Sequence, residues 1–536
     1  MRSVMKHSFS EVPTANIPRS SFNRSHGLKT TFDADYLIPV IVDDIVPGDT
    51  FNVNMNFFAR LATPLYPIMD NMYLESFFFF VPYRLVWDNW KKMHGEQVDP
   101  ADSIDFTVPA VGTSTTHDLT VNNGFGNICD YFGLPYHSSA DLTEISALPF
   151  RAYNLIYNEW FRDQNLQDSK TVNVDNGPDA AGTDYALFKR GKRHDYFTSC
   201  LPWPQKGDAV SLPLGTVAPV TGIGFIDSAM PTTNTTVNET GTTGPTTTYT
   251  EAWISANIAS YLAFEGDGSD HPNIYADLST ATAATINDLR LAFQTQRLLE
   301  RDARAGTRYN ELILAHFGVT VPDFRVQRPE FLGGGSSAIN VTPVAQTSGQ
   351  PTPVADDKLG NLAGFGTVSG RHGFMKSFVE HGVLIGLVNV RGDITYSQGM
   401  ERYWTKNTRY DFFYPVLAQI GEQSVLNKEL WYNNDANDDA VFGYQERYAE
   451  YRYKPSRLTN LMRVDHDTPL SAWHLSEDFA TLPTLGSSFI QSNTGVPLDH
   501  ALAINTEPHF IADFHFDMKC ARPMPLYGVP GNLDHF

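Results

Sequence analysis

The sequence predicts a mainly β protein, a β-sandwich of the jelly-roll type that carries large insertions. Residues with the two-residue alternation of strands lie near both ends of the chain, at 51–57 and 513–519. Segments with helical spacing and long polar loops lie between them. No unit of roughly 20 to 50 residues repeats, which argues against a solenoid or a propeller. A sandwich whose last strands pair with its first strands explains this order.

The composition indicates a large core and extensive contact with other subunits. Of the 536 residues, 42% are hydrophobic and 12% aromatic, whereas only 18% are charged. The formal net charge of −21 argues against a surface that binds nucleic acid over most of its area. Any contact with nucleic acid must therefore be local.

The cysteines and the apolar runs indicate in which cellular compartment the protein folds. Three widely spaced cysteines, Cys129, Cys200 and Cys520, do not form a disulfide framework and fit a reducing environment. The first residues contain no apolar leader, and the longest apolar run, at 381–390, is too short to span a bilayer. We therefore expect neither a signal peptide nor membrane insertion.

Residues 1–30 are polar, rich in extended-chain signals and positively charged. They are either a frayed terminus or an arm that contacts single-stranded DNA (ssDNA). The candidate ssDNA-facing residues, opposed by Glu11 alone, are Arg2, Lys6, Arg19, Arg24 and Lys29.

Two strands follow this segment. In 51–57 the apolar residues alternate with three asparagines, which predicts one buried and one exposed face. In the next strand Phe77 and Phe79 point one way, whereas Phe78 and Phe80 point the other way. We expect these four residues, with Trp87 and Trp90 on a short helix over 85–96, to lie in the core or between subunits.

Further elements are predicted by spacing. A helix is expected over 149–164, where aromatic residues recur at helical intervals after a proline, and two more over 285–304 and 307–317. Residues 333–370, rich in Gly, Ser and Pro, read as a loop, and the apolar run 383–390 reads as a strand.

Residues 207–282 form an insertion of distinct composition. No Lys or Arg occurs from 207 to 289, and eleven of the twenty residues at 231–250 are threonine. The segment is either a flexible linker or a projection from the body. Because linkers seldom carry Trp, Tyr and Phe, we favour a projection.

The chain contains few patterns that indicate catalysis or metal binding. Asp513, His515 and Asp517 share one face of a strand, with His509 upstream, and Asp465, His466, Asp467 and His474 form a second cluster. Alternate strand residues can share a metal, but an ordinary polar strand face is the better interpretation of both clusters. No catalytic or nucleotide-binding motif occurs, so we expect no enzyme activity and no cofactor.

The segment 443–457 interleaves tyrosines with cations. Bases stack on tyrosine and phosphates pair with arginine, so a contact with ssDNA is reasonable. Tyr and Arg are also enriched between subunits, and both interpretations stay open. The candidates are Tyr448, Tyr451, Arg452, Tyr453, Lys454 and Arg457.

Long runs throughout the chain resemble the major capsid proteins of the small ssDNA microviruses (Microviridae), in particular the gokushovirus branch. The runs include "FFFFVPYRLVWDNWKKMHGE", "RAYNLIYNEWFRDQN", "GKRHDYFTSCLPWPQKG", "RYNELILAHFGV", "RPEFLGG", "HGVLIGLVNVR", "QERYAEYRYKPSRLTN" and "PMPLYGVPG". The resemblance implies a viral jelly roll of eight strands that assembles, through pentamers, into a T=1 icosahedral shell around circular ssDNA. It also implies a small basic DNA-binding protein and a minor DNA-pilot protein as partners.

On this reading the chain divides into a basic arm (1–30), a first part of the jelly roll with inserted helices (31–206), the Thr-rich insertion (207–282) and the remainder of the jelly roll (283–536). The insertion is expected to form a surface protrusion that binds a host receptor. The protein would be part of the virion and assemble in the bacterial cytoplasm. The alternative is a carbohydrate-binding or carbohydrate-active β-sandwich protein, because such proteins share the fold.

Overall fold

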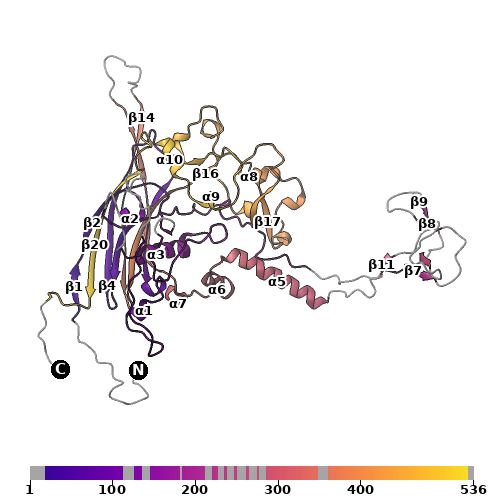
Figure 1. Ribbon diagram of the computed structural model, residues 1–536. Coiled ribbons are helices and arrows are strands. Elements are labelled where there is room, and N and C mark those ends of the chain that lie inside the picture. Colours follow the sequence, from indigo (N-terminus) through magenta and orange to yellow (C-terminus); the bar gives the residue numbers. More distant parts are fainter. Residues whose placement is uncertain are drawn as a thin grey trace. The chain divides into compact units, whose positions relative to one another are not determined.

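The computed structural model describes residues 18–112, 126–135, 145–180, 184–211, 285–347 and 360–528, and the backbone of six short strands between 220 and 276. The chain divides into two compact units, Met1–Pro204 with Ala303–Phe536, and Gln205–Asp302. The first unit contains two large antiparallel sheets, as predicted for a mainly β protein (Figure 1).

The first sheet has the strand order β1-β20-β4-β14-β13, and β2 also pairs with β20. Its strands are β1 (Ser20–Asn23), β2 (His26–Phe32), β4 (Thr50–Leu61), β13 (Asn340–Ala345), β14 (Leu362–Ser377) and β20 (Phe510–Arg522). β20, at the end of the chain, lies between β4 and the two N-terminal strands. The prediction that late strands pair with early ones is confirmed.

The second sheet has the order β12-β5-β15-β3. Its strands are β3 (Ile38–Ile45), β5 (Met72–Pro82), β12 (Glu330–Ala338) and β15 (Gly382–Gly392). Every residue of β15 is buried, because this strand has a neighbour on each side and both of its faces are covered. Two smaller two-stranded sheets pair β16 (Thr395–Tyr396) with β19 (Ser476–Glu477) and β17 (Glu422–Leu426) with β18 (Val441–Glu446).

The main core lies between the two large sheets. The alternation predicted in β4 is confirmed: Phe51, Val53, Met55 and Phe57 are buried, while the residues between them are more exposed. Phe514, Phe516 and Met518 of β20 occupy the same cluster. In Figure 1 the labelled strands β2, β20 and β4 run side by side, and the register joins Phe514 directly to Phe57.

The helices of the first unit pack outside this sandwich or connect its strands, and α5 belongs mostly to the second unit. They are α1 (Trp90–Met93), α2 (Ile128–Tyr131), α3 (Leu148–Ile156), α5 (Ile286–Ala305), α6 (Tyr309–Phe317), α7 (Asp323–Val326), α8 (Asn427–Leu430), α9 (Ser487–Ile490) and α10 (Gly495–Ala501). Short 3-10 turns are η2 (Tyr83–Leu85), η5 (Arg402–Thr405), η6 (Arg409–Asp411), η7 (Pro415–Leu417), η8 (Ala449–Tyr451), η9 (Asn460–Met462) and η10 (Ser471–Trp473). The expected helix over 149–164 is α3, which continues as a π-turn, η4 (Tyr157–Phe161).

α3 is fixed to the body by a buried ion pair. The guanidinium of Arg151 is fully buried and donates to Asp179, with Nη2 2.6 Å from Oδ1. Burial alone would raise the pKa of Asp179, but the hydrogen bonds from Arg151 and Tyr185 outweigh it and lower this pKa. The aromatic residues of α3 then form a second core cluster with β5 and β15.

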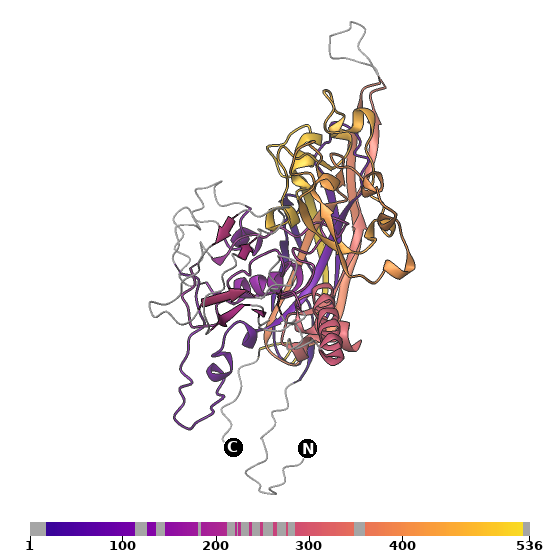
Figure 2. The same cartoon turned by 90° about the vertical axis from the view of Figure 1, so that its right-hand side faces the viewer.

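The predicted loop over 333–370 is wrong for most of its described part. Residues 333–338 belong to β12, 340–345 form β13, and 362–370 belong to β14. The glycines serve close packing rather than turns, because a Cβ on Gly334 would overlap the carbonyl oxygen of Ser76. β13 and the first part of β14 form a hairpin that continues past the end of β4, at the upper end of the body in Figure 2.

The helix predicted over 85–96 is also shorter than expected. Only Trp90–Met93 is α-helical, preceded by η2, and Trp87 lies between the two. Proline at position 82 restricts the backbone where β5 ends. Trp87 is buried within the second core cluster and does not belong to a helix.

The second unit contains short strands and most of α5. β6 (Val220–Thr221) pairs with β11 (Tyr275–Ala276), β7 (Ile223–Ile226) with β10 (Tyr261–Phe264), and β8 (Thr235–Val237) with β9 (Thr247–Tyr249). Thr-rich segments therefore do form strands in part, which β-branched side chains favour. α5 begins at Ile286, where the Thr285 hydroxyl accepts from the backbone of Asp288 and caps the helix.

Candidate functional site

The Phe-rich strand β5 is apolar on both faces because it separates two cores. Phe78 and Phe80 belong to the cluster between the sheets, where their rings lie 5.3 Å from Phe374 and 4.7 Å from Phe378, respectively. Phe79 is buried in the other cluster, against Trp160. The packing within a single chain thus covers both faces, and a neighbouring subunit is not required for it.

Phe77, Trp87 and Trp90 lie on the side of the second cluster. Phe77 is partly buried and its ring contacts Phe161 edge to face. Trp87 is fully buried, and its indole N–H donates to Asn176 at 2.9 Å. Trp90 is partly buried and packs against Tyr83. These placements assign the aromatic residues mainly to the core.

The described part of the basic N-terminal segment forms strands rather than a free extension. Residues 20–32 form β1 and β2 at the edge of the first sheet, while Arg2 and Lys6 lie outside the described residues. Arg24 pairs bidentately with Asp43, with Nη2 2.9 Å from Oδ1. Lys29 lies 3.6 Å from Asp513, an exposed pair of little energetic weight.

Arg19 differs from these two cations. Its guanidinium donates to the carbonyl oxygen of Gly48 at 2.6 Å and to the hydroxyl of Thr50 at 2.8 Å, and both acceptors are neutral. Among the described cations of the basic segment, Arg19 is therefore the one without a carboxylate partner in its described contacts.

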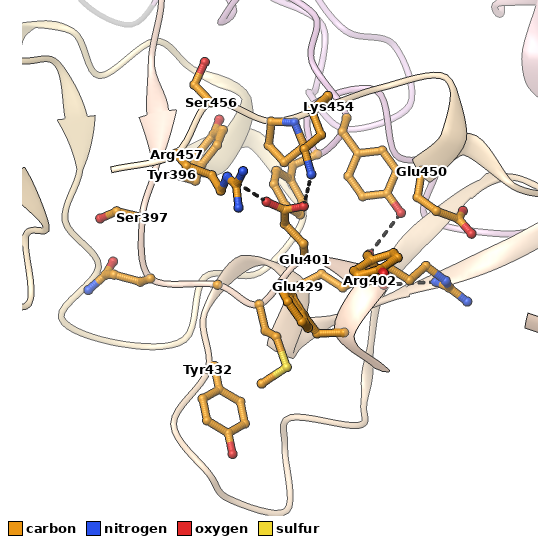
Figure 3. A pocket seen from close by; sticks show the side chains of 18 of the residues that line it. Tyr396, Ser397, Glu401, Arg402, Glu429, Tyr432, Glu450, Lys454, Ser456 and Arg457 are labelled. Atoms are coloured by element: carbon orange, nitrogen blue, oxygen red, sulfur yellow. Dashed lines mark hydrogen bonds and ion pairs between the residues drawn. The ribbon is translucent and has the colours of Figure 1, made fainter. Parts of the chain in front are cut away.

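The Tyr/Arg segment lines one wall of a cavity of about 540 Å³ (Figure 3). Lys454 and Arg457 both point toward Glu401 and pair with it, the Arg457 contact being 3.4 Å long. Arg452 pairs with Glu446. Arg452, Lys454 and Arg457 thus each contact an acid, although Lys454 and Arg457 share one, and this weakens their attraction for phosphate.

The tyrosines of the segment divide between core and surface. Tyr448 is buried, and its hydroxyl donates to the carbonyl oxygen of Tyr410. Tyr453 is stacked on Tyr196, and burial raises the pKa of Tyr453 to about 12. Tyr451 is exposed, with the ammonium of Lys406 3.8 Å from its ring centroid. Only Tyr451 presents a ring that could stack on a base.

Two exposed apolar surfaces were not singled out by the sequence pattern. The first is the aromatic surface over 403–414, whose exposed rings are Tyr403, Trp404, Tyr410, Phe412, Phe413 and Tyr414. The second, the α6–α7 patch, contains exposed Tyr309, Leu314, Phe317, Val319 and Phe324. α6 has no buried residue although most of its side chains are apolar, a composition typical of a covered helix.

The two candidate metal clusters do not assemble. Asp513 and His515 point outward from β20, and His509 instead bonds Asp499, with Nε2 2.9 Å from Oδ1. Within the described ranges, no three His, Cys, Asp or Glu side chains come together as a metal site. No helix in that part of the chain is both long enough and apolar enough to traverse a bilayer.

Comparison with known proteins identifies the family of the chain. The pattern of the capsid protein (F protein) family matches residues 10–532. The chain belongs to this family. Its relatives include capsid protein VP1 of Bdellovibrio phage phiMH2K, 46% identical over 544 residues that cover 99% of this chain and 98% of that protein.

Two further F-family relatives match over nearly their full length. Capsid protein VP1 of Chlamydia phage 1 is 42% identical over 599 residues, covering 99% of this chain and 98% of that protein. Capsid protein VP1 of Spiroplasma virus 4 is 35% identical over 557 residues, covering 98% and 97%. These matches confirm the predicted resemblance to the major capsid proteins of microviruses and a structural rather than enzymatic role.

As an F-family capsid protein the chain is a component of the virion and assembles into a shell of many copies. The alternative of a carbohydrate-binding or carbohydrate-active protein is not favoured, because the capsid family accounts for the whole length of the chain.

Proposed function

We propose that this protein is the main subunit of a T=1 icosahedral shell that encloses a circular ssDNA genome, as in the gokushovirus branch. The observation that carries the proposal is the end-to-end match to capsid proteins VP1 of three bacterial viruses. Pentamers would form first in the bacterial cytoplasm, and a closed shell would repeat each contact by symmetry.

Contact between copies is supported by the two exposed apolar surfaces. The α6–α7 patch and the aromatic surface over 403–414 are larger than the isolated apolar residues expected on a monomer. A second copy of the chain is the natural cover in a shell, since permanent interfaces are large and apolar. The ring of Tyr451 lies 6.1 Å from that of Phe413, and Tyr453, Lys454 and Arg457 line the same cavity as Tyr403 and Trp404. Tyr451, Arg452, Tyr453, Lys454 and Arg457 are proposed to contact a neighbouring copy, or ssDNA through Tyr451.

Contact with ssDNA is proposed for the basic segment. Arg19 has no acidic partner in its described contacts and is therefore a better candidate than Arg24 and Lys29, while Arg2 and Lys6 are candidates by their charge. Phosphate neutralisation would supplement a small basic DNA-binding protein, with a minor DNA-pilot protein as a further partner.

The insertion over 207–282, free of Lys and Arg, is proposed to face outward and bind a host receptor.

Expression of the full-length chain in bacteria tests the shell. Light scattering and electron microscopy of the purified protein should reveal pentamers or closed particles of uniform size. A stable monomer at all protein concentrations would contradict the proposal.

The ssDNA contact needs a separate test on complete virions. Replacing Arg2, Lys6 and Arg19 by Gln should lower the nuclease-protected DNA per particle, whereas replacing Arg24 and Lys29, which have acidic partners, should lower it less. An unchanged DNA content in both variants would contradict the assignment to the basic segment, and an equal loss in both would contradict the preference for Arg2, Lys6 and Arg19.

A further inference from the structure

A second, larger cavity of about 1050 Å³ is lined in part by Glu75, Phe77 and Phe79 of β5, and all its lining residues belong to the first unit. We refer to it as the Arg190 cavity. Its apolar floor is formed by Phe77, Phe79, Trp160, Phe161 and Phe331. Its cationic residues are Arg162, Arg190, Lys192, Arg193, Arg304, Arg308 and Arg391.

The centre of the Arg190 cavity contains more positive than negative charge. Glu75 is shared by two guanidinium groups, those of Arg190 and Arg391, the latter with Nη2 2.8 Å from Oε2. Arg193 pairs with Asp393, again at 2.8 Å. Three arginines thus face two carboxylates. Lys192, Arg304 and Arg308 also line the cavity and have acidic partners of their own, Glu477, Glu422 and Glu311. The lining contains one further carboxylate, Asp163, and one further cation, Arg162.

The shared carboxylate of Glu75 and its two arginines are poorly solvated. The excess of positive charge around them is therefore energetically unfavourable. The side chains of Arg190, Arg391 and Glu75 are 17%, 8% and 12% exposed. Burial, reinforced by the charge of Arg391, lowers the pKa of Arg190 to about 10. A buried cation that lacks a full counter-charge is stabilised by any anion that reaches it.

The guanidinium of Arg190 is also oriented to donate further hydrogen bonds. It stacks 4.6 Å from the centroid of Phe77, which fixes its plane. Its Nη1 donates to Glu75, while its Nε and Nη2 make no hydrogen bond to a described residue. A planar fork with free N–H groups matches the oxygens of a phosphate.

We propose that the Arg190 cavity binds a phosphate group, held by Arg190 together with the positive charge of Arg391 and Arg193. The phosphate is either free inorganic phosphate or part of a nucleic-acid backbone, since both present the same tetrahedral oxyanion. The proposal does not depend on the shell geometry or on the basic N-terminal segment.

Titration calorimetry on the purified full-length protein tests this site. Sodium phosphate is added at constant ionic strength, with sodium chloride as the reference, and a short oligothymidylate is titrated in parallel. Saturable binding of inorganic phosphate is expected if the free ion is the ligand. Saturable binding of the oligonucleotide alone would identify the nucleic-acid backbone as the source.

Matched variants assign the binding to the cavity. Arg190→Gln should weaken the affinity about tenfold or more, because it removes a charge-assisted hydrogen bond. Arg193→Gln, at a more exposed position, keeps the test decisive if Arg190→Gln fails to fold, and should weaken binding severalfold. Arg84→Gln, which breaks an ion pair with Glu380 outside the cavity, should bind like the unmodified protein. Absence of saturable binding by either ligand, or equal affinity in all variants, would overturn the proposal.

Discussion

Phe78 and Phe79 are neighbours in the chain that are buried in different cores. Phe78 contacts the facing sheet, whereas Phe79 packs under α3 and η4. Each ring fills a space closed by other rings, so loss of either would leave a cavity rather than an exposed surface. At this scale the function depends on packing, because a shell subunit has to keep one shape in every copy.

Phe78→Ala should therefore lower the free energy of unfolding by about 3–5 kcal/mol. Phe58→Ala is the matched control, since Phe58 lies on the outward face of β4 and is 51% exposed. Urea denaturation of the full-length chain, followed by tryptophan fluorescence, compares the two. Similar losses in both variants would contradict the assignment of Phe78 to a closed core.

His372 provides a pH-dependent contribution to the same core. Its Nδ1 lies 2.7 Å from the Ser76 hydroxyl and its Nε2 lies 3.0 Å from the Ser337 hydroxyl. Burial lowers its pKa below the ordinary 6.5, so the folded chain binds this proton less readily than the unfolded chain. The contribution of His372 is complete above pH 6.5 and is lost as the pH falls below that value.

His372→Gln should accordingly reduce the loss of thermal stability between about pH 7 and pH 5.5, measured by differential scanning calorimetry. His515→Gln, on the exposed face of β20, is the matched surface variant for the comparison. An identical pH profile for His372→Gln and the unmodified chain would refute the role of this ring.

At the scale of elements, the glycines of β12 decide how closely the sheets approach. Gly334 lies against the backbone of β5, and a Cβ on Gly335 would overlap the ring of His372. Propensity predicts a loop there, because glycine weakens strands in isolation. The alternating strands β4 and β20 were predictable from their own residues, whereas the residues of β12 do not favour a strand and its pairing with β5 stabilises it.

Gly334→Ala should destabilise the protein by about 1–3 kcal/mol, since the new methyl group forces β12 away from β5. Gly486→Ala is a suitable control, because Gly486 is extended and has open space around its Cα. Thermal denaturation of both variants checks the prediction. A loss of stability in Gly486→Ala as large as in Gly334→Ala would show that the close approach of β12 to β5 is not responsible.

At the scale of the whole molecule, the chain consists of two units with separate structural roles. The strands of both large sheets belong to the first unit, and residues 205–302 have their own internal contacts. The strand pairing of the two large sheets therefore does not require the second unit.

Replacement of residues 208–282 by a short Gly/Ser linker should leave particles that assemble but adsorb poorly to host cells. Electron microscopy measures the assembly and a plaque or adsorption assay measures the binding. Failure of assembly, with a folded subunit, would assign the insertion to contacts between copies instead of host recognition.

The sequence by itself determined the mainly β class, the alternation in β4 and β20, the return of the last strand to the first ones and, through long matching runs, the capsid family. These features are local or are carried by whole-length similarity. Only the tertiary structure decided which face of β5 each phenylalanine fills, that Lys454 and Arg457 share Glu401, and that Arg190 and Arg391 share Glu75. Residues hundreds of positions apart set the solvation and the charge balance of these groups, and such long-range proximity cannot be read from the spacing of residues along the chain.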